Sequence, residues 1–349
     1  MADLDPWYLD HLVCPVDKSA LSFDGHRLVS ANGRTYPVVE GLPVMLVAEE
    51  QQTMDIARAS IDRAQGRASA IDARAPGYYL ESLGISEEEK LRVLELIATG
   101  AGTIDPVVSL LVSGTSGNAY VHLRGNADVA FYPIPTIELP AGDGRSLLDV
   151  GCNWGRWSIA ATRAGYRVVG IDPSLGAVMA ARRVAKSLGV DVRHVVGDAR
   201  WLPFKPDSFD TAYSYSVLQH LAKDNVRLAL GELKRVLKPG GSAKIQMAAK
   251  HGLRSLQHQA RRGFREPVDF EVRYWPVAEL ARVFAELIGP TRVTTDCYFG
   301  LGWQWSDYAH MRPMHKPILI ASEALKRLSN ILPPLRYVAD SVFCTATKV

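Results

Sequence analysis

The middle of the chain alternates between short apolar runs and longer stretches in which apolar residues recur at helical spacing. The apolar runs have the length of buried strands and lie near residues 146–150, 167–171, 192–196, 209–215 and 242–247. The stretches with helical spacing lie between them, near residues 155–164, 175–188 and 226–237. Because strands and helices alternate in this way, the sequence predicts an α/β fold with a parallel, doubly wound sheet.

The last third of the chain supplies the segments that would complete this sheet. Residues 277–287 have helical spacing, and strand-like runs follow at 292–297 and 342–347. Added to the five central strands, these two runs predict a seven-stranded sheet. The stretches 250–275 and 298–340 do not fit the alternation, and we interpret them as insertions in a domain that spans residues 141–349.

The first 50 residues show a different pattern and predict a separate unit. Short β-like runs are separated there by the dipeptides Asp24-Gly25 and Asn32-Gly33, which are strong hairpin-turn signals. We therefore expect a small β-rich module at the amino terminus.

Residues 51–140 connect this module to the sheet domain, and apolar positions recur in them at helical spacing. Ser86, with Glu89 three residues later, is the pattern of a capping box at the start of a helix. We expect this segment to form a helical cap or linker.

One glycine turn directly follows the first central strand. Gly151 and Gly155 come after the apolar run and let the backbone approach a ligand without interference from a Cβ atom. Their spacing differs from the Gly-x-Gly-x-x-Gly pattern that seats a pyrophosphate, and the acidic Asp149 precedes them. The next strand ends in Asp172, where folds of this kind bind a ribose diol. The pattern therefore predicts a site for a nucleoside that carries no pyrophosphate.

Four motifs occur in order over about residues 140–250, namely Asp149-x-Gly-x-x-x-Gly155, Asp172, Gly197-Asp-Ala199 and Leu237-Lys-Pro-Gly-Gly241. In this order they resemble the class I S-adenosylmethionine-dependent methyltransferases of the methyltransferase type 11 group. The resemblance implies a Rossmann-like sheet and S-adenosyl-L-methionine as cofactor, with Asp198 and Ala199 framing the adenine. The cofactor-binding residues that we expect are Asp149, Gly151, Cys152, Asn153, Gly155, Asp172, Pro173, Asp198, Ala199, Ser214 and Ser216. Asp149 has an equally plausible structural role, in which its carboxylate fixes the glycine turn through backbone N–H groups.

A catalytic base is needed in methyl transfer only when the acceptor must lose a proton. His220 lies just beyond the fourth strand, and the near-neutral intrinsic pKa of histidine suits a general base. Its alternative role is to position the cap or the cofactor, and the sequence leaves both roles open. We interpret Trp154 and Trp157 as core residues of the first helix rather than as a platform for the ligand.

The stretch 250–265 follows the fifth strand, where this fold usually carries acceptor specificity. It holds five cationic side chains, which are Lys250, Arg254, Arg261, Arg262 and Arg265. They either form a solvated helix face or bind phosphate or carboxylate, since guanidinium groups form bidentate bonds with both. On the second interpretation, the substrate-binding residues that we expect are Arg261, Arg262, Tyr274 and Trp275.

The N-terminal motifs Leu12-x-Cys-Pro and Gly33-Arg-x-Tyr-Pro-Val-x-Glu-Gly-Leu-Pro-Val44 resemble a small zinc-ribbon-like family. Members of that family activate methyltransferases that act on transfer RNA and protein. The resemblance covers about forty residues, but Asp17 stands where the family has the second cysteine of its first pair, and the later pair is absent near residues 30–32. Because one thiolate cannot hold a tetrahedral structural zinc site, we expect no metal and a module that packs on the enzyme.

Composition adds little about partners. The 349 residues carry a formal net charge of +3 and are 47% hydrophobic and 22% charged, as in an ordinary soluble globular protein. This charge argues mildly against a large nucleic-acid partner, which leaves a basic footprint. The four cysteines are scattered, which favours a reducing cytoplasm over a disulfide framework. An uncharged apolar run of about eighteen residues is absent, so we expect no membrane span.

The leading functional hypothesis is an enzyme that methylates an oxygen or nitrogen of a small-molecule or glycan-like acceptor, with an anionic acceptor as one option. An alternative is a transfer-RNA or protein methyltransferase with a fused activator-like module, which residues 12–44 alone suggest. A third hypothesis is a non-catalytic S-adenosylmethionine-binding module, which the intact cofactor motifs disfavour. The sequence does not indicate the oligomeric state.

Overall fold

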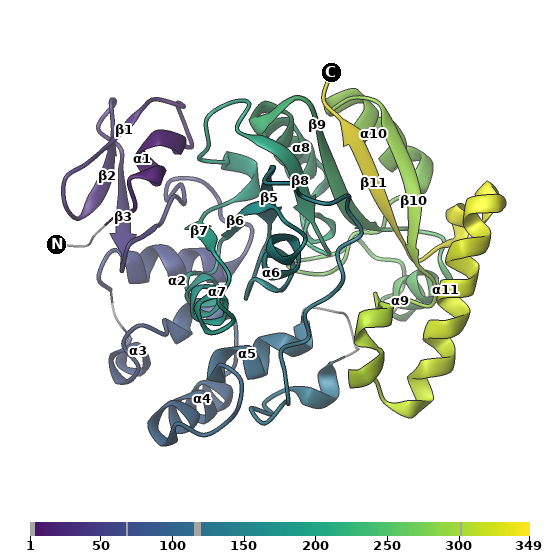
Figure 1. Ribbon diagram of the computed structural model, residues 1–349, viewed down its shortest axis with the longest axis horizontal. Helices are drawn as coiled ribbons and strands as arrows, with labels where there is room; N and C mark the ends of the chain where they lie inside the picture. The colour runs from purple at the N-terminus through teal and green to yellow at the C-terminus, as the bar shows by residue number, and fades with distance from the viewer. Residues whose placement is uncertain (1–3, 68, 115–119, 301) are drawn as a thin grey trace.

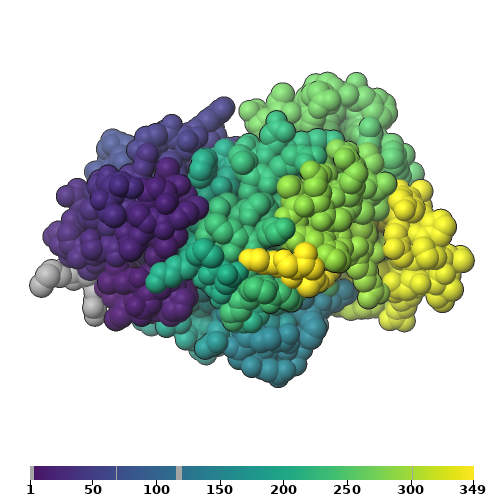
Figure 2. Space-filling view, turned by 90° about the horizontal axis from the view of Figure 1, so that it is seen from above, coloured from purple at the N-terminus to yellow at the C-terminus, as the bar shows by residue number. Residues whose placement is uncertain are grey.

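The computed structural model describes residues 4–67, 69–114, 120–300 and 302–349. The first three residues of the expected N-terminal module, residues 68 and 115–119 of the expected cap, and residue 301 of the second insertion lie outside the described residues. The described chain forms a central sheet, with a small N-terminal sheet at one end of the long axis and a C-terminal helix at the other (Figure 1, Figure 2).

The central sheet has seven strands, as the sequence predicted. They are β5 (Ser146–Val150), β6 (Arg167–Asp172), β7 (Val192–Val196), β8 (Phe209–Ser214), β9 (Leu237–Ala248), β10 (Thr291–Cys297) and β11 (Ser341–Thr347). Their order is β10-β11-β9-β8-β5-β6-β7. The five strands from β5 to β9 are parallel, whereas β11 runs antiparallel between β9 and β10. The sheet reverses its order between β5 and β8, which is where ligands bind in open α/β sheets.

Helices cover both faces of this sheet, so its strands are buried on both sides. α6 (Arg156–Arg163) and α7 (Leu175–Ser187) pack on one face, and α8 (Lys223–Val236) and α10 (Val277–Leu287) on the other. Side chains along β5 alternate accordingly. Leu147 joins the core beside α6, whereas Leu148 joins the core beside α8 and α10.

The N-terminal module is a four-stranded sheet with one helix. Its elements are α1 (Trp7–His11), β1 (Leu21–Phe23), β2 (Arg27–Ser30), β3 (Thr35–Val39) and β4 (Leu42–Pro43). The β-rich character agrees with the prediction, although the sequence analysis did not predict α1. The chain after β4 pairs with the edge strand β7, where the Met45 N–H donates to the Val196 carbonyl oxygen at 2.7 Å. Apolar residues of the module share one core cluster with the central sheet, so the module packs directly on the sheet domain.

The segment 51–140 contains the helices α2 (Asp55–Ala64), α3 (Ala70–Arg74), α4 (Glu87–Thr99) and α5 (Pro106–Leu111). The capping box is present at the start of α4, since the Ser86 side chain accepts from the Glu89 N–H and the Glu89 carboxylate accepts from the Ser86 N–H. Helices α2 and α5 pack against α7. The division of the chain at residues 50 and 140 remains our proposal.

The two C-terminal insertions add α9 (Leu253–Arg261) and α11 (Lys316–Ile331). The sequence analysis did not predict α11, which packs against β10 at the edge of the molecule (Figure 1). Short 3₁₀ helices complete the described structure at Leu80–Leu83, Val112–Gly114, Val121–Leu123, Ala199–Trp201, Leu218–His220, Trp305–His310, Pro313–His315 and Pro333–Val338. Among the described residues, every helix is too short or too polar to cross a membrane.

Candidate functional site

A cavity of about 160 Å³ lies at the carboxyl ends of β5, β6 and β7, and we call it the first cavity. Nine of the twelve residues that the sequence analysis assigned to the cofactor or to catalysis line it. These are Gly151, Cys152, Asn153, Asp172, Pro173, Asp198, Ala199, Ser216 and His220. The structure therefore brings together motifs that are separated by up to seventy positions in the chain.

The turn after β5 has a conformation that requires glycine. Gly151 has φ +77°, and a Cβ atom on it would lie 2.3 Å from the Val217 side chain. The N–H groups of Gly151 and Cys152 both donate to the Ile171 carbonyl oxygen, at 2.8 and 3.1 Å. These bonds hold the turn against the end of β6 and leave its outer surface facing the cavity.

Asp172 ends β6, and its carboxylate is held by two backbone donors. One oxygen accepts from the Asn153 N–H at 3.0 Å and the other from the Ser174 N–H at 2.9 Å. The side chain is 7% exposed, and burial raises its pKa to about 6. Asp172 thus presents a fixed carboxylate to the cavity, with further lone pairs available to hydroxyl donors.

Asp198 lies across the cavity, after β7. Its carboxylate forms an ion pair of 2.7 Å with Arg200, whose guanidinium also donates to the Gln51 carbonyl oxygen at 2.9 Å. This network joins the end of β7 to the segment that leads from the N-terminal module into the cap.

Three residues expected at the cofactor lie behind the cavity and support its turn instead. The Asp149 carboxylate accepts from the Ser158 hydroxyl at 2.6 Å and not from N–H groups of the glycine turn, and burial raises its pKa to about 7. The Ser214 hydroxyl donates to the Val150 carbonyl oxygen at 2.8 Å and so joins β8 to β5. Gly155 begins α6 with φ +82°. None of these three residues lines the cavity, and their contact with the cofactor stays a prediction.

His220 lines the first cavity, and its orientation is fixed. Its Nδ1 lies 2.7 Å from the Phe270 carbonyl oxygen, and its ring stacks on the Phe270 ring at 3.9 Å. A carbonyl oxygen only accepts, so Nδ1 carries the proton and Nε2 is the basic nitrogen. Burial lowers the pKa of His220, although the Phe270 and Ser216 backbone opposes the shift. The ring is therefore neutral at neutral pH.

The structure also adds lining residues that the sequence analysis missed. Arg156 and Trp157 follow the glycine turn in the first turn of α6 and line the cavity, whereas Trp154 is core. Trp157, which the sequence predicted as a core residue, belongs to a buried core cluster and also contributes to the cavity wall, whereas Arg156 was not singled out from the sequence. Thr53, Met54 and Ile56 approach from the cap, and no feature of the sequence marked them.

A second cavity of about 180 Å³ adjoins the first, and both are lined by Tyr215 and Ser216. The second cavity lies between β9, β10, α9 and the residue that precedes β11. Its remaining lining residues are Gln219, Gln246, Ala248, Arg254, Ser255, His258, Val272, Tyr274, Cys297, Gly300, Gly302, Asp340 and Ser341. Tyr274 is the one expected substrate-binding residue among them, and Arg254 is the one arginine.

The other three expected substrate-binding residues line neither cavity among the described residues. Arg261 is exposed at the end of α9, and Arg262 donates to the Val272 carbonyl oxygen at 3.0 Å. Trp275 is 0% exposed because it lies in the core beside β9, with Lys223 Nζ 4.4 Å from its ring centroid. Stacking of Trp275 on an acceptor ring is therefore a wrong prediction, and the two arginines do not form the expected anion pocket.

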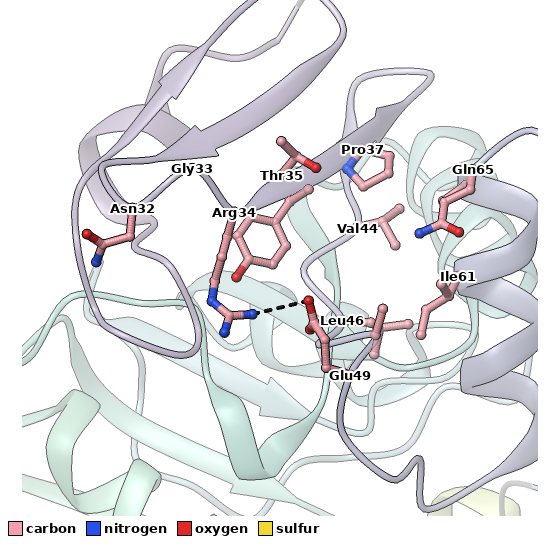
Figure 3. A pocket seen from close by; sticks show the side chains of 13 residues that line it. Asn32, Gly33, Arg34, Thr35, Pro37, Val44, Leu46, Glu49, Ile61 and Gln65 are labelled. Carbon is pink, nitrogen blue, oxygen red and sulfur yellow. Dashed lines mark ion pairs between the residues drawn. The ribbon is translucent and has the colours of Figure 1, made fainter.

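A groove of about 430 Å³ lies away from both cavities, between β3 and α2 (Figure 3). Arg34 and Glu49 form an ion pair of 3.3 Å along it, and Ile61 of α2 and Gln65, directly after this helix, form the opposite wall. It contains none of the residues expected at the cofactor or the acceptor, so we give it no part in the reaction.

The loops of the N-terminal module are joined by hydrogen bonds. The Asn32 amide donates to Asp17 at 2.7 Å, and Cys14 Sγ lies 3.1 Å from the Tyr36 hydroxyl. Asp17 and Asn32 thus connect the two loops at which the zinc-ribbon-like family would need metal ligands. In the part of the chain that the structure describes, no three His, Cys, Asp or Glu side chains are grouped to hold a metal ion.

Residues 147–241 match a family model described as a methyltransferase domain. An uncharacterized methyltransferase of Mycolicibacterium paratuberculosis is 40% identical over 104 residues, which are 29% of this chain and 38% of the relative. The ubiquinone biosynthesis O-methyltransferase of Agrobacterium fabrum is 34% identical over 99 residues, which are 28% of this chain and 39% of the relative. A solved S-adenosylmethionine-dependent methyltransferase of Methanosarcina mazei is 20% identical, with a TM-score of 0.42 over 59% of this chain and 93% of that one.

The family match covers the glycine turn, Asp172 and Asp198, and it lies within the parallel part of the sheet. Residues 147–241 are therefore similar to methyltransferase domains, in agreement with the resemblance of the motifs to class I S-adenosylmethionine-dependent methyltransferases. The chain spans less than half the length of the two curated relatives. The resemblance of the N-terminal module to the zinc-ribbon-like family remains a prediction.

Proposed function

We propose that this protein binds S-adenosyl-L-methionine in the first cavity and transfers its methyl group to an oxygen or nitrogen of a small molecule. The observation that carries the proposal is the fixed carboxylate of Asp172 beside the glycine turn at Gly151. A carboxylate at this strand end accepts from both hydroxyls of a ribose, and the absence of a Cβ atom lets the ligand approach the turn.

The remaining lining residues fit the other parts of this cofactor. Asp198 and Ala199 lie beside each other after β7, where the resemblance places the adenine. Arg156, at the start of α6, brings a positive charge to the cavity, and its ion pair with Asp307 at 3.0 Å holds it there. The glycine turn lacks the Gly-x-Gly-x-x-Gly pattern that seats a pyrophosphate, which favours a nucleoside with an amino-acid arm over a dinucleotide.

S-adenosyl-L-methionine supplies an electrophilic methyl group, and as the acceptor's lone pair forms the new bond, the carbon–sulfur bond breaks and its electron pair stays on sulfur. The protein's task is to align and dehydrate the reacting atoms, since little covalent chemistry is asked of it. Tyr215 and Ser216 line both cavities, so an acceptor in the second cavity would meet the cofactor at these two residues.

An acceptor hydroxyl must also lose its proton. We propose that Nε2 of His220 accepts it, because the ring is neutral and Nδ1 donates to Phe270. The name of the Agrobacterium relative, an O-methyltransferase, favours oxygen as the acceptor atom. If His220 instead positions the cofactor, its replacement by Gln will raise the KM for S-adenosylmethionine and leave the pH dependence of kcat unchanged. The cytoplasmic location remains a prediction from the sequence.

Calorimetric titration of the purified protein with S-adenosylhomocysteine tests the proposal. We expect one site per chain, with NADH unable to compete because the turn does not suit a pyrophosphate. If S-adenosylhomocysteine does not bind, or if NADH displaces it, the proposal is refuted.

A further inference from the structure

The second cavity contains a buried carboxylate with an unused oxygen. Asp340, the residue before β11, is 4% exposed and lines this cavity. Its Oδ1 accepts from the Ser255 N–H in the first turn of α9 at 2.7 Å. Its Oδ2 is buried and has no hydrogen-bond partner among the described residues. A buried carboxylate oxygen without a donor is costly, so this position calls for a donor from a ligand.

The position of Asp340 is built into the fold. A Cβ atom on Gly252 would lie 2.3 Å from Asp340 Oδ1, so the glycine lets α9 begin against the carboxylate. The Asp340 backbone is also fixed, since its carbonyl oxygen accepts from the Ala249 N–H at 2.8 Å and its N–H donates to the Cys297 carbonyl oxygen at 3.1 Å. The carboxylate cannot swing into solvent without breaking this arrangement.

A second acceptor on the wall of the same cavity is also without a donor. Gln219 is 7% exposed, and its amide nitrogen donates to the Ser216 hydroxyl oxygen at 2.8 Å. Its Oε1 is buried and has no hydrogen-bond partner in the described chain. Ser216 is shared with the first cavity, so Gln219 marks the end of the second cavity that is nearer the cofactor, and Asp340 supplies a second point of attachment.

The charges in this cavity do not favour an anion. Arg254 and Asp340 both line it and carry opposite charges. His258 and Tyr274 are directed at each other, with His258 Nδ1 3.1 Å from the Tyr274 hydroxyl, and burial lowers the pKa of His258. Phosphate and carboxylate bring only acceptor oxygens, which would face the unmatched oxygens of Asp340 and Gln219.

From these contacts we propose that the second cavity is the acceptor pocket and that it selects a small molecule rich in hydroxyl or amino donors. This inference rests on the proposed function, because the methyl group comes from the first cavity. The acceptor's O–H or N–H groups bond to Asp340 Oδ2 and Gln219 Oε1, and a further hydroxyl or amine faces Tyr215 and Ser216 for methylation. The second cavity has a volume of about 180 Å³, which suits a small molecule.

The variant Asp340→Asn tests this assignment with little change in shape. It keeps the oxygen that accepts from Ser255 and replaces the unused oxygen with an NH₂ group, which donates and cannot accept. The matched control is Arg261→Ala. It removes a solvent-exposed side chain from α9, the helix that Asp340 contacts through Ser255, and leaves both cavities intact. If the acceptor bound at an anion site at the exposed end of α9, Arg261→Ala would weaken its binding more than Asp340→Asn.

The experiment titrates probes into protein that is already saturated with S-adenosylhomocysteine. The probes are glucose and glucosamine, and their anionic counterparts glucose 6-phosphate and glucuronate. We expect the two donor-rich probes to bind more tightly than the anionic pair, and Asp340→Asn to weaken them by roughly ten- to a hundredfold. Arg261→Ala should leave them unchanged, and all three proteins should bind S-adenosylhomocysteine equally.

Three results would overturn the inference while the proposed function stands. In each of them S-adenosylhomocysteine still binds. The first is tighter binding of the anionic probes than of the donor-rich ones, and the second is equal affinity of Asp340→Asn and the parent for the donor-rich probes. The third is that none of the four probes binds. Failure of S-adenosylhomocysteine to bind the parent is a different result, because it refutes the proposed function itself. Once a turned-over acceptor is known, Asp340→Asn should raise its KM and leave the KM for S-adenosylmethionine unchanged.

Discussion

Replacing Asp172 with Asn removes the charge that we assign to the ribose hydroxyls and keeps the size of the side chain. Loss of the charge-assisted bonds should weaken S-adenosylhomocysteine binding by roughly 2 to 4 kcal/mol, or about thirtyfold to a thousandfold. The amide also leaves one of the two backbone donors, at Asn153 or Ser174, facing an NH₂ group. Some loss of folding stability should therefore accompany the loss of affinity.

A matched control separates these two effects. Asp105→Asn also alters a carboxylate that accepts from two backbone N–H groups, those of Val107 and Val108, and it lies outside both cavities. Calorimetry on folded protein should show parent-like binding for Asp105→Asn and weak binding for Asp172→Asn. Equal binding by the parent and Asp172→Asn would refute the assignment of the ribose to this carboxylate.

The pH dependence gives a second test of the same residue. Because burial raises the pKa of Asp172 to about 6, its ionised fraction rises from about one tenth at pH ~5 to about nine tenths at pH ~7. Affinity for S-adenosylhomocysteine should rise roughly tenfold over this range in the parent and stay flat in Asp172→Asn. The free energy of unfolding without ligand should change in the opposite direction. A carboxyl group with a raised pKa stabilises the fold at low pH, and this contribution is lost as the pH rises through about 6.

Three further predictions concern residues outside the cavities. In urea denaturation near neutral pH, Asp149→Asn should have nearly the same free energy of unfolding as the parent, because burial raises the Asp149 pKa to about 7. Asp149→Ala should lower the free energy of unfolding by about 1 to 3 kcal/mol, because it leaves the Ser158 hydroxyl unpaired. Equal losses in the two variants would contradict this. Burial lowers the pKa of His194 to about 4. Neutral His194 should therefore contribute about 3 kcal/mol to the free energy of unfolding, and this contribution should be lost as the pH falls from ~6.5 to ~4. The difference in the free energy of unfolding between the parent and His194→Asn should change over that range. Elemental analysis should find no stoichiometric zinc, because Cys14 and Asp17 bond to Tyr36 and Asn32 instead; one zinc per chain would overturn this.

Segments with a strong local pattern could be predicted from the sequence. The strand at residues 146–150 and the helix at 277–287 have the predicted bounds, because a short apolar run before glycine and an amphipathic stretch after proline each leave one interpretation. Helix α11 could not be predicted in this way, since Ile320 and Ile331 are 49% and 76% exposed and blur the contrast between its faces. Strand β9 begins at Leu237 and not near 242, because Leu237, which the helical spacing assigned to the preceding helix, pairs with Phe209 of β8.

The same distinction separates the two cavities. Gly151 and Asp172 could be predicted because each occupies a fixed place relative to one strand, and that relation is visible in a short stretch of sequence. Asp340 and Gln219 could not be predicted, because their significance is the absence of a hydrogen-bond donor after burial. The arginines predicted an acceptor site at the end of α9, which is exposed. Asp340 lies instead beside the start of that helix, because β9 pairs with β11.

A crystal structure of the protein with S-adenosylhomocysteine would test the cofactor site most directly. We expect the ribose hydroxyls within hydrogen-bond distance of the Asp172 carboxylate, the adenine beside Asp198 and Ala199, and the sulfur facing Tyr215 and Ser216. Ligand density at another place, or a ribose turned away from Asp172, would contradict this expectation.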